Sequence, residues 1–453
     1  MRFARSLSPS AHCDNLSYSA APVATIKGMS TDSPSDVVLS YADAVAVVQA
    51  QAAYLLALPH LDLESVPLLD ARGRVLASPV LADREQPPFD RSTRDGYACR
   101  AEELDAGPLR VAGLVRAGEM WQSTLATNDA IEIMTGAPVP TGADCVVMLE
   151  HVTAQENHIM LMGGRTLRPG ENIVPAGSEA RRGANVLAVG TRLSAQHLAV
   201  AAYCGQEHVN CFRNPRIAVQ ATGDELVQVS ESPLPFQIRN SNSYSLAAQI
   251  CDAGGEPLVM PILRDDREAT ASAILHMLSD IGADLILLSG GVSMGRFDFV
   301  EAALKDLGAE FFFTGVKIQP GKPVVFGRMP SRNVNKWTYF FGLPGNPIST
   351  LVTFALFVHP LLNALAGDTS KVPHFGLAEL VSPTAIKSGL TRFIPAFLAD
   401  HEFTPRVEVI AWQGSGDLAS NAQANCYVVV PPEREDGKKE LAAGEMVPVL
   451  LIG

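Results

Sequence analysis

Residues 284–299 read DLILLSGGVSMGRFDF, and this stretch decides how the surrounding segment is expected to fold. Four apolar residues in succession predict a buried strand, which the Ser-Gly-Gly turn then ends. A further glycine and Asp298 precede an apolar-periodic segment, so the pattern is strand, glycine-rich turn and helix. Such a turn leaves backbone N–H groups free to bind an anion at a helix start.

The same alternation of strand and helix extends over residues 214–367. RIAVQA precedes TGDEL, EPLVMPIL precedes RDD, and TYFF precedes GLPGNP and a long apolar helix. Near-continuous apolar strands that alternate with helices are typical of a parallel sheet covered on both faces. We therefore predict a central α/β domain with a mostly parallel sheet.

The flanking segments predict further domains, as expected for a chain of 453 residues. Short β-rich runs between Pro and Gly turns predict an inserted β domain over 81–171. Residues 39–80 and 172–213 lie on either side of it and are expected to form one elongated, discontinuous domain. Short β runs over 368–453 predict a C-terminal β-barrel. Residues 1–38 are expected to be a disordered extension, or alternatively a transit peptide.

Composition argues against several classes of function. A formal charge of −13 argues against binding of nucleic acid or an anionic membrane, because both need a basic face. The seven cysteines form no CxxC pair, so neither a zinc site nor a disulfide framework is predicted. We expect reduced cysteines and a cytoplasmic location. No stretch reaches the ~18 uninterrupted apolar residues of a membrane-spanning helix.

In an open parallel sheet, ligands bind beyond the carboxyl ends of the strands, where the glycine turns of this chain fall. The predicted phosphate-binding residues are Ser289, Gly290, Gly291, Ser293, Gly345, Asn346 and Pro347. Carboxylates follow the same strands: Asp224, Glu225, Asp265, Asp266 and Asp298. Carboxylates beside a phosphate site suggest Mg²⁺ shared with phosphate oxygens.

Each of these features also has a plainer interpretation. Any one glycine turn is compatible with an ordinary loop, and Asp298 alone is compatible with a helix cap. Lys322 in PGKP is either a solvated surface residue or an anion ligand held on a rigid turn. Asp95 in STRDGY and Thr135 in MTGAPVPTG indicate only turns. Several strand ends of this type in one sheet nevertheless favour a site.

The quoted segments resemble the molybdopterin molybdenumtransferase family, which includes MoeA and the E domain of gephyrin. The resemblance covers residues from about 40 to 453, and nine motifs occur in the family's order. They are PPFDRSTRDGYA, IMTGAPVPTGADCVV, PGENIVPAGSEARRG, ATGDEL, IRNSNSY, SGGVSMGRFDF, QPGKP, GLPGNP and QGS…ANC.

The resemblance implies an elongated homodimer that inserts molybdate into adenylylated molybdopterin and releases AMP, with Mg²⁺ as cofactor. It also implies exchange with apo-molybdoenzymes or the upstream adenylyltransferase. By position, it implies metal ligation by Glu225, Asp265 and Asp298. It implies catalytic roles for these three residues and for Asp95, Thr135 and Ser415. It implies molybdate contacts from Lys317, Lys322, Pro323 and Ser415.

Several basic positions of the family differ in this chain. Gly315 stands where the family usually has a basic residue, although Lys317 is expected on the same strand face. Gln319 replaces a common lysine, and Leu390 replaces an arginine that is otherwise next to Gly389. We expect Arg94, Arg296, Lys317 or Arg392 to compensate.

Two other functions remain open from the sequence. The sheet motifs are shared with enzymes that adenylylate molybdopterin, although the additional β domain and barrel argue against that reaction. A non-catalytic carrier or scaffold is the third possibility, and the acidic set argues against it. The choice between molybdate and tungstate is not decided by the sequence, because the two oxyanions share charge and shape.

Overall fold

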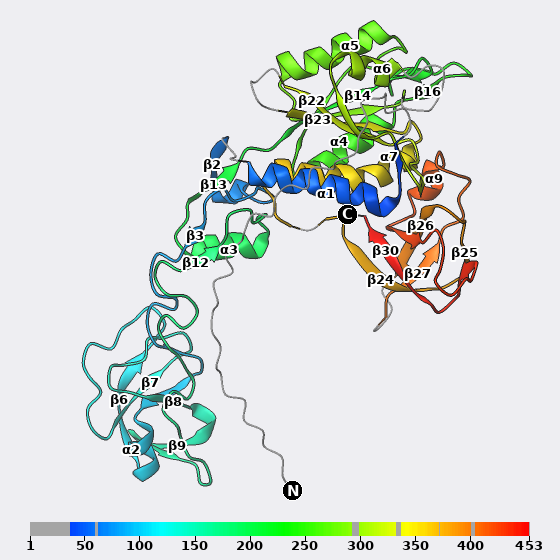
Figure 1. Ribbon diagram of the computed structural model, residues 1–453. Coiled ribbons are helices and arrows are strands. Elements are labelled where there is room, and N and C mark those ends of the chain that lie inside the picture. Colours follow the sequence, from blue (N-terminus) through cyan, green and yellow to red (C-terminus); the bar gives the residue numbers. More distant parts are fainter. Residues whose placement is uncertain are drawn as a thin grey trace. The chain divides into compact units, whose positions relative to one another are not determined.

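The computed structural model describes residues 37–58, 62–291, 299–331, 337–370, 372–399 and 404–452 (Figure 1). Three six-stranded sheets form the framework of these residues. One lies in the segment that follows residue 214, one in the inserted segment, and one near the C-terminus. The multidomain α/β and β composition predicted from the sequence is therefore confirmed, whereas the domain boundaries remain predictions.

The central sheet contains four parallel strands and an antiparallel pair. Its strand order is β17 (Glu256–Val259), β14 (Arg216–Ala221), β18 (Leu285–Ser289), β23 (Trp337–Leu343), β22 (Val325–Pro330) and β19 (Glu310–Phe313). Strands β17, β14, β18 and β23 run parallel, whereas β22 and β19 are antiparallel to their neighbours. The motifs predicted for the site follow the parallel strands. The antiparallel pair was not predicted.

Helices cover both faces of this sheet (Figure 1). Those on one face are α4 (Asn242–Asp252), α7 (Pro347–Thr353) and α8 (His359–Leu365), and those on the other are α5 (Arg267–His276) and α6 (Phe299–Asp306). Along β18, Leu285 and Leu287 pack into the first core, whereas Ile286 and Leu288 pack into the second. Because both faces are buried, Leu285 to Leu288 are all apolar, and the polar Ser289 comes only at the carboxyl end of the strand.

One helical run, Pro347–Leu365, contains α7, a π-helical segment (Phe354–Val358) and α8. It is the one described helix that is long and apolar enough to cross a membrane by length and composition. In this fold, however, 72% of its most apolar window is buried inside the protein. The run therefore packs as a core helix of the central sheet.

The helix predicted near residue 40 is α1 (Tyr41–Ala57), and its N-cap Ser40 accepts a hydrogen bond from the backbone N–H of Asp43. Its buried residues Ala44 and Val48 belong to the same core as α8. The Tyr41 ring also packs edge-on against Phe393, with 5.4 Å between centroids. Helix α1 thus stabilises the central sheet, although the sequence placed it with the elongated segment.

The remainder of that elongated segment pairs as a discontinuous unit, since residues before the inserted domain contact residues after it. Its elements are β2 (Leu63–Pro67) with β13 (His208–Phe212), β3 (Val80–Leu81) with β12 (Asn185–Leu187), and helix α3 (Ala195–Tyr203). Nearby, β4 (Arg91–Ser92) pairs with β11 (Ile173–Val174).

The inserted segment forms the second six-stranded sheet, with the short helix α2 (Ala101–Ala106). The strand order is β8 (Cys145–Met148), β5 (Gly96–Cys99), β7 (Asp129–Ile133), β6 (Leu109–Val115), β10 (His158–Leu161) and β9 (Val152–Gln155). The sheet has its own apolar core, which includes both Cys99 and Cys145 as free thiols.

The C-terminal segment forms a barrel, as predicted. Its strands are β26 (Thr391–Ala399), β27 (Arg406–Val409), β24 (Phe375–Leu380), β30 (Met446–Leu451) and β28 (Cys426–Val430), and β28 pairs back onto β26. Strand β21 (Ile318–Gln319), from the central segment, joins the edge of β26.

Short 3-10 helices span Leu68–Asp70 and Leu149–His151, and a π-helical segment, Met277–Ile281, follows α5. The remaining smaller elements of the described residues are short strand pairs and one helix. They are the pairs β1 (Val38–Leu39) with β20 (Gly315–Val316), β15 (Leu226–Val227) with β16 (Ile238–Arg239) and β25 (Thr384–Ala385) with β29 (Glu440–Leu441), and helix α9 (Leu418–Asn421).

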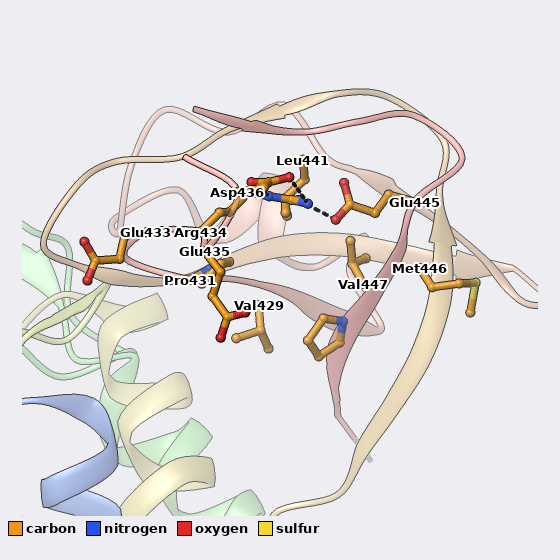
Figure 2. Close-up of a pocket in the computed structure, with 11 residues that line it drawn as sticks. Val429, Pro431, Glu433, Arg434, Glu435, Asp436, Leu441, Glu445, Met446 and Val447 are labelled. Carbon is orange, nitrogen blue, oxygen red and sulfur yellow. Dashed lines mark hydrogen bonds and ion pairs between the residues drawn. The ribbon is translucent and has the colours of Figure 1, made fainter. Parts of the chain in front are cut away.

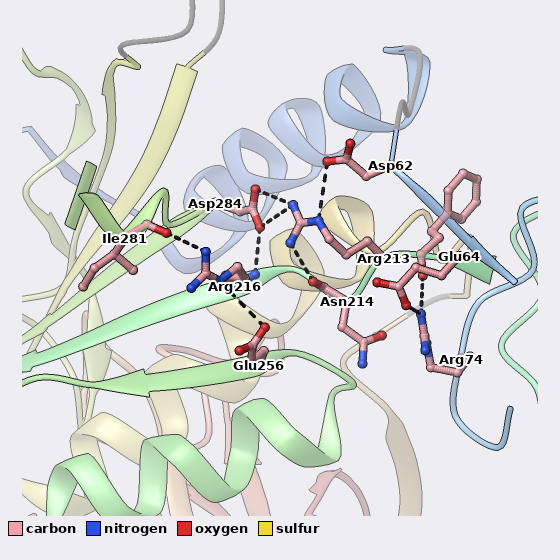
Figure 3. Close-up of polar contacts among 10 residues, drawn as sticks. Asp62, Glu64, Arg74, Arg213, Asn214, Arg216, Glu256, Ile281 and Asp284 are labelled. Atoms are coloured by element: carbon pink, nitrogen blue, oxygen red, sulfur yellow. Dashed lines mark hydrogen bonds and ion pairs between the residues drawn. The ribbon is translucent and has the colours of Figure 1, made fainter. Parts of the chain in front are cut away.

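Ionic contacts connect the elongated segment to the amino ends of the central strands (Figure 3). The Arg213 guanidinium contacts both carboxylate oxygens of Asp284, at 3.2 and 3.1 Å, and Asp62 at 3.4 Å. Asp284 also accepts the backbone N–H of Arg216 at 2.7 Å, so one carboxylate joins the chain entering β14 to the chain entering β18. The opposite ends of these strands remain available for a site.

A more deeply buried ion pair fixes the end of α8. Arg192 Nε lies 2.6 Å from Asp368 Oδ2, and the Asp368 side chain is fully buried. The same guanidinium donates to the carbonyl of Gly73 at 2.8 Å and to the Asn363 side chain at 3.3 Å. Arg192 therefore connects three separate segments through one charge.

We expect Asp368→Asn to lower the free energy of unfolding by about 3 kcal/mol, because it leaves the partly buried Arg192 charge without its counter-ion. Chemical denaturation followed by circular dichroism measures the change. Glu179→Gln is the matched control, because the Arg91–Glu179 pair is solvent-exposed and should contribute at most ~0.5 kcal/mol. Equal effects of the two substitutions would contradict the structural role of the buried pair.

The neighbouring His359 predicts a pH dependence of stability. Burial, and then the nearby Arg192 charge, lower the pKa of His359 to about 4. The unfolded chain binds this proton below its ordinary pKa of about 6.5, so stability is complete above that value and falls as the pH drops toward 4. We expect the lowered pKa of His359 to reduce the free energy of unfolding by about 2 kcal/mol as the pH falls from 7.5 to 5. The stability gap between wild type and His359→Gln should narrow over this range, and a constant gap would contradict the prediction.

Candidate active site at the carboxyl ends of the central strands

The carboxyl ends of the parallel strands enclose a cavity of about 190 Å³. Its lining comes from the segments after β14, after β17, after β18 and after β23, and from the turn before β22. The lining residues are Thr222, Gly223, Glu225, Asp265, Gly290, Gly291, Pro323, Pro344 and Gly345. The structure thus brings together residues from each strand end that the sequence singled out.

Two carboxylates of the predicted set, Glu225 and Asp265, line this cavity. Burial, and then the negative charges of Asp224 and Glu225, raise the pKa of Asp265. A bound cation would relieve this repulsion, so the donor set is compatible with a hard cation such as Mg²⁺. Asp266 has a different role, because its side chain caps α5 by accepting the N–H of Ala269 at 2.7 Å.

The turn after β18 requires glycine at Gly290 and Gly291, because its backbone packs closely against Thr222. Gly290 and Gly291 have φ values of +92° and +65°, which favour glycine. A Cβ at Gly290 would lie 2.4 Å from the carbonyl oxygen of Thr222, so no side chain fits there. Both glycines line the cavity, and the Gly290 N–H donates to the Leu343 carbonyl at 3.2 Å.

Asn242, at the start of α4, joins Ser289, the residue before the Gly290–Gly291 turn, to Gly345 in the cavity wall, and it was given no role from the sequence. Its side-chain amide donates to Ser289 Oγ at 2.9 Å and to the carbonyl of Gly345 at 2.8 Å. Ser289 is almost fully buried, so the predicted phosphate-binding hydroxyl is held in place by this contact. The only signal in the sequence was the motif IRNSNSY, which contains this asparagine.

Asn346 and Pro347 begin the long helical run, with Asn346 as N-cap and Pro347 in the first turn. The barrel segment approaches this helix start, because the backbone N–H of Ile348 donates to the Ser415 carbonyl at 3.0 Å. Ser415 also lines a wide hollow of about 700 Å³ with Gln413, Gly414, Gly416, Asp417 and Ser420. Ser415 therefore lies beside the helix start that follows β23, and its role in the site remains a prediction.

The PGKP turn borders the cavity through Pro323. Lys322 is exposed, and its carbonyl accepts the N–H of Val316 at 2.9 Å. Lys317 is also exposed, and its backbone bonds to Leu39 and Thr391. Neither lysine forms an ion pair within the described part of the chain, so both ammonium groups are available to an anion.

Asp95 and Thr135 pair with each other on the inserted sheet. The backbone N–H and the hydroxyl of Thr135 donate to Asp95 Oδ1 at 2.7 and 2.9 Å. These two hydrogen bonds lower the pKa of Asp95. Neither residue lines the strand-end cavity, so the structure unites them with each other but not with the other predicted site residues.

Three predicted residues, Ser293, Arg296 and Asp298, lie outside the described residues. Within the described ranges, no group of three or more His, Cys, Asp or Glu side chains is arranged to hold a metal ion. Of the three predicted metal ligands, Glu225, Asp265 and Asp298, the structure therefore describes the first two.

A second cavity, of about 450 Å³, lies in the barrel (Figure 2). It combines apolar side chains such as Val429 and Val447 with the acidic Glu433 and Glu435. The Arg434 guanidinium that borders it is already paired with Asp436 and Glu445. The residues that border this cavity include several acids and no unpaired cation. The cavity is therefore poorly suited to an anionic substrate.

Comparison with known proteins assigns the chain to a family. Family models match residues 39–205 (MoeA N-terminal region, domains I and II), 218–364 (probable molybdopterin binding domain) and 378–452 (MoeA C-terminal region, domain IV). The molybdopterin molybdenumtransferase of Haemophilus influenzae is 33% identical over 88% of this chain and 97% of that protein. This chain belongs to the MoeA family.

Other similar proteins agree with this assignment. The molybdopterin molybdenumtransferase of Bacillus subtilis is 34% identical over 86% of this chain and 90% of that protein. The crystal structure of the molybdopterin biosynthesis MoeA protein from Pyrococcus horikoshii superposes with a TM-score of 0.74, at 28% identity, over 92% of this chain and all of that chain.

Against the expected MoeA pattern, the structure explains one altered basic position and locates another. A Cβ at Gly315 would lie 3.2 Å from Val38 Cγ2, so strand β1 occupies the space of a longer side chain. Gln319 pairs in register with Arg392. Gln319 Oε1 and Arg392 Nε are both buried without a hydrogen-bond partner in the described residues.

We expect Asp265→Asn to weaken Mg²⁺ binding without lowering the melting temperature of the ligand-free protein. The substitution removes a negative charge that Asp224 and Glu225 repel, so it eliminates an unfavourable interaction along with a cation ligand. Calorimetric titration with Mg²⁺ and a thermal melt measure the two effects. Asp266→Asn changes the same charge one residue away and keeps a good helix cap, so it should alter neither. A clear loss of stability in Asp265→Asn would contradict this interpretation.

Proposed function

We propose that this chain is a molybdopterin molybdenumtransferase, which inserts molybdate into adenylylated molybdopterin and releases AMP during molybdenum cofactor biosynthesis. The observation that carries the proposal is the match to transferases of this name over most of both chains. The strand-end cavity supports it, because glycine backbone and carboxylates line one small space. The preceding adenylylation reaction is not favoured, since the matches extend over the inserted and C-terminal segments as well.

In this proposal, the glycine turn binds the phosphoanhydride of the substrate. The Gly291 N–H and the Ser289 hydroxyl provide donors for phosphate oxygens, and the helix that starts after Asn346 adds the positive end of its dipole. The Gly290 N–H already donates to the Leu343 carbonyl, and the Ile348 N–H to the Ser415 carbonyl. Glu225, Asp265 and Asp298 hold Mg²⁺, which supplies neutralisation of the phosphate charge when bound. The repulsion at Asp265 supports this assignment, because a cation would relieve it.

Molybdate is the second substrate, and the exposed ammonium groups bind it. Lys317 lies two residues before the QPGKP turn and Lys322 lies within it, and both present exposed cationic side chains. Pro323 lies at the cavity wall and Ser415 beside the helix start. An oxygen of molybdate or of water attacks the phosphorus on the molybdopterin side of the anhydride, the bridging P–O bond breaks, and AMP leaves with the bridging oxygen. The two dithiolene sulfurs replace oxygen ligands of molybdenum, which leave as water or remain on the phosphate. Holding both substrates at one sheet edge removes much of the entropic cost of this encounter.

Asp95 and Thr135 act in catalysis from the inserted sheet. Asp95 is held as a carboxylate by its two hydrogen bonds from Thr135, which supports a role in binding a donor group or a cation. We also propose that the protein is a homodimer that receives its substrate from the upstream adenylyltransferase and delivers its product to apo-molybdoenzymes.

Purified protein with Mg²⁺ and adenylylated molybdopterin should release AMP in a molybdate-dependent manner, and the product should activate an apo-molybdoenzyme. Chromatography of AMP and reconstitution of the enzyme measure the two steps. Omission of Mg²⁺, and separately Asp298→Ala, should each lower the rate at least about 100-fold, as expected when electrostatic stabilisation is lost. Tight binding of the substrate without turnover would instead identify a carrier or scaffold.

A further inference from the structure

Thr222 carries a buried hydroxyl that no described group satisfies. The residue follows β14 directly, its backbone N–H donates to the Ser289 carbonyl at 2.9 Å, and only 3% of it is exposed. Its Oγ1 atom is buried without a hydrogen-bond partner among the described residues, yet Thr222 lines the strand-end cavity. The sequence motif ATGDEL contains this residue, but only its acidic members were predicted to act.

An unpaired hydroxyl in such a place is unfavourable for the protein alone. Burial removes the hydrogen bonds between the hydroxyl and water, and this free energy is recovered only when another group accepts a hydrogen bond from the hydroxyl. Most buried polar side chains in folded proteins have a partner, so an exception at the wall of a ligand cavity is informative. The missing acceptor is then expected to arrive with the ligand.

The glycine turn defines where that acceptor would lie. Positions built for a Cβ on Gly290 and on Gly291 fall 3.2 and 2.9 Å from Thr222 Oγ1, so the hydroxyl is in close contact with this turn. The Gly290 N–H already donates to the Leu343 carbonyl at 3.2 Å, so a phosphate oxygen at this turn would bind the Gly291 N–H, beside the same hydroxyl. The side chain offers one O–H donor, and phosphate oxygens are strong acceptors.

We propose that Thr222 is a substrate-binding residue, whose hydroxyl donates a hydrogen bond to a phosphate oxygen of the adenylylated substrate. This inference rests on the proposed function, because it takes the anhydride of that substrate as the ligand of the Gly290–Gly291 turn. It adds a hydroxyl donor, on a strand adjacent to that of Ser289, to the predicted binding residues.

Thr314 provides a matched control in the same chain. Its hydroxyl is also buried without a partner among the described residues, and the residue is 9% exposed. It follows β19 and does not line the strand-end cavity. Thr→Val at either position removes an unsatisfied hydroxyl at nearly constant shape, so the two substitutions differ only in their relation to the cavity.

The experiment is anaerobic calorimetric titration of adenylylated molybdopterin into wild type, Thr222→Val, Thr222→Ser and Thr314→Val, with a thermal melt of each ligand-free protein. We expect Thr222→Val to bind about tenfold more weakly, which corresponds to one hydrogen bond to a charged acceptor. Its melting temperature should not fall, because the hydroxyl is unsatisfied without ligand. Thr222→Ser keeps the hydroxyl and should bind with nearly wild-type affinity, and Thr314→Val should also bind like wild type.

Wild-type affinity in Thr222→Val would overturn the inference. So would weaker binding accompanied by a lower melting temperature, which would indicate a structural role, or failure of Thr222→Ser to restore affinity. Failure of the wild type itself to bind would overturn the proposed function, and this inference with it. The wild-type titration therefore distinguishes the two failures.

Discussion

The burial of both faces of the central parallel strands is the constraint on which the site depends. Residues such as Leu285 and Ile286 pack into separate cores on opposite faces, so the middle of the strand is apolar and its one polar residue, Ser289, lies at the carboxyl end. Functional groups are thereby confined to the strand ends. At the amino ends, the Arg213–Asp284 contacts join the strands to the elongated segment, whereas the carboxyl ends enclose a cavity.

Much of this arrangement could be predicted from local sequence. Uninterrupted apolar runs followed by Gly, Asp or Pro identify parallel strands and their ends, and neighbouring parallel strands must bring those ends to one edge. Glu225, Asp265 and Gly290 were predicted for this reason, and all three line the cavity. The barrel was predictable from its short β runs and turns.

What escaped prediction depends on contacts between distant segments. From the sequence, Asn242 is predicted only to lie at a helix start. Its contacts with Ser289 and Gly345 could not be predicted, because they depend on how α4 packs against the sheet. Strands β22 and β19 are rich in apolar residues, as the parallel strands are, so their composition does not predict that they pair antiparallel. Helix α1 was placed with the elongated segment because it precedes it in sequence, whereas its apolar face packs against α8.

Strand β21 belongs to the barrel by hydrogen bonding, although it lies just before the PGKP turn in the chain. The N–H of Thr391 donates to the Lys317 carbonyl at 3.1 Å, so the edge of β26 is completed by the segment that carries the lysines. The barrel is consequently not a self-contained module: cut from the chain before β24, it would present a bare strand edge. Because the Lys317 N–H also donates to the Leu39 carbonyl at 2.8 Å, a displacement of the barrel relative to the central domain would have to break one of the two backbone contacts of Lys317 or move strand β1 as well.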